Sequence, residues 1–238
     1  MGYFLGLFTG LISFLRQART FHPRGILYVA EVKSENDKIV LPDFALMRFT
    51  SAIWKKNTWP DVLGVSIRFS EYERKTFLTM PQDQDLLFAS FSSPWLTPLG
   101  PMLTRFWDFF ANDYFAVSPF RLPHGELVKF RLVPQKNSEN LSREEKIHKA
   151  CTDGTARFRL YLRPLRSRGW TQIATLRLLH ESRIDQESLR FNPFQNGCGI
   201  TPVGFVHYLR VGAYRWGQRM RPQVTAGPVL LNQDTRNA

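Results

Sequence analysis

GILYVAEVK, residues 25–33, alternates apolar with polar side chains directly after a Pro-Arg-Gly turn. Such a period of two is typical of a β-strand that buries one face. A similar alternation or a short apolar run recurs in six later segments: 44–50, 62–69, 85–91, 127–133, 156–162 and 171–180. Because these segments follow one another without regular helical crossovers, we expect an α+β chain built mainly on an antiparallel β-barrel of about eight strands with flanking helices.

Helices are expected in the middle and toward the end of the chain. Residues 94–112 have a helical texture, although prolines interrupt them, and 138–149 are polar enough for a loop or a short surface helix. Residues 201–220 predict a helix in which Thr201 is the N-cap and Pro202 the first helical residue.

No shift in composition and no Gly/Ser linker divides the chain, so we expect one domain over residues 1–238, with an apolar helix at 1–18 and a tail at 222–238. Residues 3–15, YFLGLFTGLISFL, carry no charge but are too short to span a bilayer, which takes about 20 apolar residues. This segment either packs on the body of the protein, which we favour, or contacts a membrane surface. We expect a cytoplasmic protein or one peripheral to the inner face of a membrane.

The composition is that of a globular protein with an unusual charge. Of 238 residues, 43% are hydrophobic, and the mean hydropathy of −0.26 argues against an integral membrane protein. The two cysteines, Cys151 and Cys198, lack the spacing of a zinc site, and two free thiols are favoured over one long-range bridge. The net charge of +12 attracts nucleic acid, anionic lipid or an acidic small molecule, or serves solubility alone.

One candidate constellation lies near the C-terminus. Arg210 and Tyr214 are four residues apart, so on a helix they share one face. An arginine beside a phenol favours the phenolate and lowers its pKa, and tyrosinate is a ligand for haem iron. Arg221 follows seven residues after the tyrosine, on the same side, where it could meet an anionic propionate. Taken alone, this pattern also fits an exposed basic helix.

Further motifs precede it in a definite order. Arg19, His22 and Gly25 form R-x-x-H-x-x-G just before the first strand, and residues 48–50 read R-F-T. Residues 61–69, DVLGVSIRF, and the Asp-Leu pair at 85–86 follow. In this order and at these spacings the sequence resembles the catalase family, with further landmarks at 128–130, 191–193 and 199–202. The resemblance covers residues 19–221, although the chain has about half the length of an ordinary catalase subunit.

The resemblance implies a role for each matching residue around a haem b. Tyr214 would be the ligand of the iron, and Arg210 would hold its oxygen anionic. His22 would be the acid/base on the opposite side, and Thr50 would orient its imidazole. The propionates would be bound by three arginines, whose guanidinium forks suit carboxylates: Arg19, Arg48 and Arg221. Other basic residues are expected on a solvated strand face: Arg157, Arg159 and Arg163.

One family feature is absent from the sequence. The catalase asparagine that helps to hold hydrogen peroxide should follow Asp85-Leu86, where the chain reads FASFSS and offers only hydroxyls, of which we take Ser90 as the candidate. We therefore expect a peroxidase or hydroperoxidase that cleaves peroxide or an organic hydroperoxide and oxidises an apolar co-substrate, with weak catalase activity at most. Aromatic residues between 88 and 115 could bind that co-substrate or be core.

Two alternatives stay open: a non-catalytic haem-binding protein, and a catalase-fold shell that binds anionic lipid or nucleic acid. For the haem enzyme we expect no nucleic-acid partner, and a homodimer stays open.

Overall fold

The computed structural model describes residues 25–204 except for 37–38, 53–58, 94–98, 117, 138 and 186–188. The expected helix at 1–18, the tail at 222–238 and most of the helix expected at 201–220 lie outside the described residues. Five of the candidate site residues lie outside them too: Arg19, His22, Arg210, Tyr214 and Arg221.

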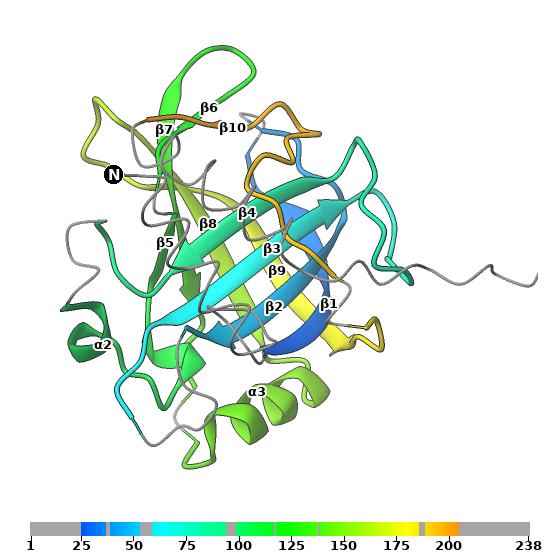
Figure 1. Cartoon of the computed structure of the whole chain (residues 1–238), viewed down its shortest axis with the longest axis vertical. Coiled ribbons are helices and arrows are strands. Elements are labelled where there is room, and N and C mark those ends of the chain that lie inside the picture. Colours follow the sequence, from blue (N-terminus) through cyan, green and yellow to red (C-terminus); the bar gives the residue numbers. More distant parts are fainter. Residues whose placement is uncertain are drawn as a thin grey trace, which may run out of the picture.

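The described chain is dominated by one antiparallel sheet that closes on itself (Figure 1). Its strands are β1 (Gly25–Ser34), β2 (Phe44–Ser51), β3 (Leu63–Ser70), β4 (Gln84–Ala89), β5 (Tyr114–Ala116), β6 (Phe120–Arg121), β7 (Leu127–Pro134), β8 (Arg157–Pro164), β9 (Thr171–Glu181) and β10 (Thr201–Pro202). The sheet order is β10-β6-β7-β5-β4-β3-β2-β1-β9-β8, and pairing of β7 with β8 closes an eight-stranded barrel. The expected mainly antiparallel barrel is confirmed.

Strict alternation along the strands fills the barrel. In β7 every second residue is buried, from Val128 to Pro134, and the intervening side chains face outward. The centre is aromatic: the ring of Phe49 lies 5.4 Å from Phe109 and 5.2 Å from Phe158, measured between centroids. Phe158 also stacks on Phe110 at 5.7 Å. Edge-to-face and offset pairs of this kind stabilise a core beyond their buried area.

Helix α3 (Arg143–Thr152) lies across one end of the barrel (Figure 1). It begins at a capping box, in which the Ser142 hydroxyl accepts from the Glu145 amide and the Glu145 carboxylate accepts from the Ser142 amide. Ile147 and Ala150 then reach the barrel core. Of the two alternatives for residues 138–149, a loop or a short surface helix, the structure shows a helix from Arg143 that extends to Thr152.

The helix expected over 94–112 was wrong for the residues that the structure describes. Only α2 (Gly100–Leu103) and the 3-10 turn η2 (Phe109–Ala111) are helical. Asn112 explains the interruption, because its side-chain amide donates to the carbonyl oxygens of Arg105 and Asp108 and replaces helical hydrogen bonds. Asp108 in turn caps η2 by accepting from the Phe110 amide at 2.8 Å.

The expected helix start at Thr201 was also wrong. Thr201 and Pro202 form β10, which pairs with Arg121 and Phe120 of β6. The backbone at Ile200 is held by the Gln84 side chain, whose amide nitrogen donates to the Ile200 carbonyl at 3.1 Å. β10 ends its sheet, a position at which a proline without an amide hydrogen is tolerated.

Within the described residues, no helix is long and apolar enough to cross a membrane. Cys151 is buried and Cys198 partly buried, and both are free thiols.

Candidate functional site

The outer face of β1–β4 carries the described part of the candidate site. Strand register aligns its outward positions in three rows that run across the four strands. The first row is Gly25, Thr50, Gly64 and Ala89; the second is Leu27, Arg48, Ser66 and Leu87; the third is Val29, Leu46, Arg68 and Asp85. Small side chains make up most of the first row, so this end of the face is flat. The motifs that lie far apart in sequence therefore meet on one surface.

Arg48 and Thr50 are neighbours on this face, in adjacent rows of β2. Both are almost wholly buried, with 5% and 3% of their surface exposed. The Thr50 hydroxyl donates to the Gly64 carbonyl at 3.3 Å, which fixes the hydroxyl over the glycine of the DVLG motif. A buried guanidinium thus lies next to a buried hydroxyl, beside a row in which the other three residues are Gly25, Gly64 and Ala89.

Gly25 is required at its position because β1 passes close to these two side chains. A Cβ atom at Gly25 would lie 2.7 Å from Thr50 Cγ2 and 2.8 Å from Arg48 Nε. Contacts under 3.0 Å are not seen for real Cβ atoms, so the first strand could not enter here with a larger residue. The glycine of R-x-x-H-x-x-G therefore lets the first residue of β1 lie against Thr50.

The third row holds a buried ion pair. Arg68 donates from Nε to one oxygen of Asp85 at 2.8 Å and from Nη2 to the other at 2.7 Å. Both side chains are at most 1% exposed. A bidentate pair of this kind is the strong form of the arginine–carboxylate interaction.

The connection from β9 to β10 is tied to this ion pair. The backbone N–H of Asn192 donates to Asp85 Oδ2 at 2.7 Å. Arg68 Nη2 donates to the backbone carbonyl of Arg190 at 2.5 Å. The Arg68 guanidinium also lies 5.3 Å from the ring centroid of Phe191. Around it, apolar side chains of the connection and of β1 and β2 form a separate buried cluster: Leu27, Val29, Leu46, Ile184, Leu189 and Phe191.

The electrostatics of Asp85 are set by its burial. Burial raises the pKa of the Asp85 carboxyl, and the hydrogen bonds and charge of Arg68, with the Asn192 amide, partly offset that rise. Arg68 is therefore the partner that favours the charged form of this buried carboxyl.

Ser90 does not lie in the rows of the outer face. Its hydroxyl accepts from the Leu63 amide at 3.1 Å and shares a hydrogen bond with the Thr104 hydroxyl at 2.7 Å. The outward position of β4 beside Gly64 is Ala89, which offers no hydrogen-bonding side chain. Side chains of a strand alternate between faces, so the positions that share the face of Asp85 are 87 and 89, not 90.

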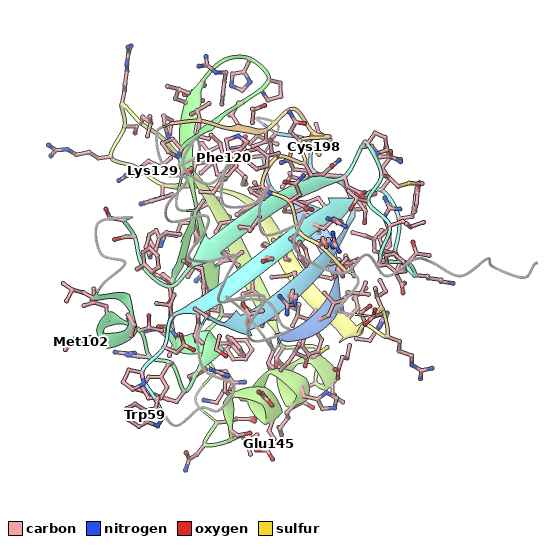
Figure 2. The ribbon with its side chains drawn as sticks, viewed as in Figure 1. Trp59, Met102, Phe120, Lys129, Glu145 and Cys198 are labelled. Carbon is pink, nitrogen blue, oxygen red and sulfur yellow. The ribbon has the colours of Figure 1, made fainter. Side chains whose placement is uncertain are left out.

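The aromatic residues considered for a co-substrate divide into two groups. Phe88, Phe109 and Phe110 belong to the barrel core and are at most 4% exposed. Trp107, in contrast, is 56% exposed; the nearby Met102, which is not aromatic, is a residue of α2 that is 81% exposed, and Figure 2 shows it at the periphery. The core explanation therefore holds for the first three.

The described residues hold no group of three or more His, Cys, Asp or Glu side chains that could bind a metal ion. The tyrosine expected to bind iron, with Arg210, Arg221, Arg19 and His22, lies outside the described residues. No family model matches the sequence, and no curated protein matches it.

Proposed function

We propose that this protein is a haem-dependent peroxidase or hydroperoxidase with a catalase-like fold. The proposal is supported by one observation above all: the separate motifs of the resemblance meet on the outer face of β1–β4. Gly25 pairs with Thr50 and Thr50 with Gly64, while Arg68, Asp85 and Asn192 are joined by hydrogen bonds. The register of these neighbouring strands also places Gly25, Thr50 and Gly64 in a single row, and the Arg68–Asp85 pair holds Asn192 from the distant β9–β10 connection.

The described residues fit one side of a haem. The first row offers a flat surface of small side chains, and Arg48 supplies a buried guanidinium one row away. A flat macrocycle with anionic propionates needs both an apolar plane and a cation at its edge. Haem b, when bound, would supply the iron at which peroxide is activated.

The roles of the chain's residues follow from the resemblance and the geometry together. Tyr214 would hold the iron, and Arg210 would keep its phenol oxygen ionised. His22 would take the proton from the peroxide and return it to the leaving oxygen. Thr50, whose hydroxyl lies where β1 enters the sheet, would orient that imidazole.

Haem binding tests the proposal directly. The purified full-length protein, loaded with ferric haem, should show the visible absorption of a phenolate-ligated iron. Tyr214→Phe should lose the haem or shift that spectrum, because a phenyl ring cannot bind iron. The control is Tyr72→Phe, since Tyr72 is 48% exposed on a surface loop and should leave the spectrum unchanged.

Either of two results would contradict the assignment of Tyr214 as the iron ligand. If no haem binds, or if Tyr214→Phe keeps the wild-type spectrum, the ligand assignment is wrong. A haem protein that consumes neither hydrogen peroxide nor an organic hydroperoxide would instead be a non-catalytic haem binder.

Hydrogen peroxide dismutation is expected to be poor, because Ala89 offers no amide beside Thr50 and Gly64. Ala89→Asn should raise oxygen evolution about 10-fold or more, since a hydrogen bond to a charged or developing charged group is worth about 1.5–3 kcal/mol. Ser90→Asn should not raise it, because residue 90 faces Leu63 and Thr104 instead. The measurement is oxygen release from hydrogen peroxide beside turnover of an aromatic reductant.

Rapid oxygen evolution by the wild-type protein, with no organic substrate consumed, would contradict this part of the proposal. Equal increases of oxygen evolution in Ala89→Asn and Ser90→Asn would show that the effect is not specific to position 89.

A further inference from the structure

The barrel wall farthest from the candidate haem site is strongly basic. Its outer positions on β7 and β8, together with the β8–β9 turn, carry six cations: Lys129, Arg157, Arg159, Arg163, Arg166 and Arg168. Figure 2 shows Lys129 at this side of the molecule. β8 lies four strands from β3 in either direction around the closed barrel. We call these six residues the basic stripe.

The basic stripe has no neutralising carboxylates among the residues that the structure describes. None of its six cations takes part in an ion pair there, whereas the neighbouring Arg131 pairs with Asp113 and Arg177 with Glu31. Its outward positions are exposed or half-exposed. Unpaired arginines in such number are free to bind an anion.

Like charges also face one another across the strands. Lys129 lies directly opposite Arg163, and Arg157 directly opposite Arg177. Like charges at such positions destabilise a sheet. The Arg163 guanidinium is held 4.8 Å from the ring centroid of Trp170, so it cannot simply turn away without losing that contact. A bound polyanion would relieve this repulsion.

The dimensions of the basic stripe select a linear polyanion. From Arg157 to Arg163 it runs about 20 Å along β8, whereas the two strands that carry it, β7 and β8, lie about 5 Å apart. Carboxylates border it on both flanks, at Asp113 and at Glu31. Both carboxylates are already paired, Asp113 with Arg131 and Glu31 with Arg177, so repulsion by the flanks does not decide the ligand. The long, narrow row of cations favours a single strand of phosphates over a flat membrane.

We propose that the basic stripe binds single-stranded nucleic acid through its phosphate backbone. Arginine forks pair well with phosphate oxygens, and five of the six stripe cations are arginines. Tyr161 lies half-exposed on β8 between Arg159 and Arg163, where a base can stack on its ring. The proposal revises the expectation of no nucleic-acid partner, and it is independent of the haem site on the opposite wall.

The test measures fluorescence anisotropy of a labelled 20-nucleotide oligo(dT) with the full-length protein at several salt concentrations. The logarithm of the binding constant should fall with the logarithm of salt at about 0.7 per phosphate contact, hence a slope near −4 for the whole stripe. In the triple variant R157Q/R159Q/R163Q the slope should shrink by about 2. Tyr161→Leu should weaken binding about fivefold or more through lost stacking.

The matched control removes three exposed cations elsewhere: Lys75→Gln, Arg105→Gln and Arg183→Gln together. It changes the net charge equally and should leave the slope near −4. Thermal unfolding is measured for both triple variants, and each should show a cooperative transition, so that a change in the salt slope reports on binding and not on loss of the fold.

Three results would overturn the proposal. Equal decreases of the salt slope in both triple variants would mean that the net charge alone attracts the oligonucleotide. Tighter binding of a 20-base-pair duplex than of oligo(dT) would remove the single-strand assignment. Stripe-dependent binding to phosphatidylserine vesicles without oligonucleotide binding would assign the stripe to lipid.

Discussion

His22→Ala is expected to lower peroxide turnover by about 10²–10⁴, the usual contribution of general acid–base catalysis, while the protein still binds haem. Without the imidazole, the proton of the peroxide has no base to receive it, and the leaving oxygen has no acid. Stopped-flow absorbance with hydrogen peroxide and with a fatty-acid hydroperoxide measures the rate, and the spectrum before mixing measures the haem.

His124→Ala is the control for that prediction. His124 lies on the surface with 53% of its side chain exposed, and its replacement should leave the rate unchanged. If His22→Ala and His124→Ala react at the wild-type rate alike, His22 is a structural residue and the proposed chemistry is wrong.

Arg68→Met is expected to lower the free energy of unfolding by about 3–5 kcal/mol at neutral pH, because it leaves a buried carboxylate without its partner. The Arg68–Asp85 pair is at most 1% exposed and is also bonded to Asn192, so solvent cannot replace the missing guanidinium. Chemical denaturation measures the loss. Arg177→Met is the control, since its ion pair with Glu31 is largely exposed and worth about 1 kcal/mol or less.

The loss in Arg68→Met should depend on pH in a defined direction. Burial already raises the pKa of Asp85, and removing Arg68 should raise it further. A carboxyl whose pKa is raised in the folded protein contributes its full stability below its pKa in the unfolded chain, about 3.9. That contribution to the free energy of unfolding is lost as pH rises through the pKa of the folded state. The free energy of unfolding that Arg68→Met loses relative to the wild-type protein should therefore be smaller at pH 5 than at pH 8. A pH-independent deficit would show that lost packing, not charge, is responsible.

The double variant Arg68→Met with Asp85→Leu separates the two contributions further. Replacing a whole buried ion pair by apolar residues is often neutral or stabilising, so most of the loss should be recovered. No recovery would mean that the docking of Arg190 and Asn192 on the pair contributes more to stability than the buried charge costs.

Local sequence patterns were enough for seven strands of the barrel and for the faces of their side chains, but not for the short strands β5, β6 and β10. The segments at 25–33, 127–133 and 171–180 were placed within a residue or so of β1, β7 and β9. Alternation is a local property, because successive side chains of a strand point to opposite faces whatever the partner strand is. The same argument placed Arg157, Arg159 and Arg163 on one face, although only the structure showed that they lack carboxylate partners among the described residues.

Local pattern failed where side chains compete with the backbone for hydrogen bonds. The helix expected at 94–112 is interrupted by the side-chain hydrogen bonds of Asn112. At Thr201, where a helix was expected to begin, the chain forms strand β10 beside β6. The bonds of Asn112 are local, four and seven residues back, whereas β10 depends on a partner strand far away in the sequence. Ser90 also depends on partners that are not adjacent in sequence, because its hydroxyl is taken by Leu63 and Thr104.

By itself the sequence determined the strand segments, the alternation that fills the barrel, and the motifs from His22 to Tyr214 that suggest a haem. Tertiary structure alone decided that β7 pairs with β8 and that Gly25, Thr50 and Gly64 form one row. It also decided that Asn192 docks on Arg68 and Asp85. The physical reason is register: which side chains meet across a sheet is fixed by long-range pairing and burial, and a shift by one residue would turn every side chain to the opposite face.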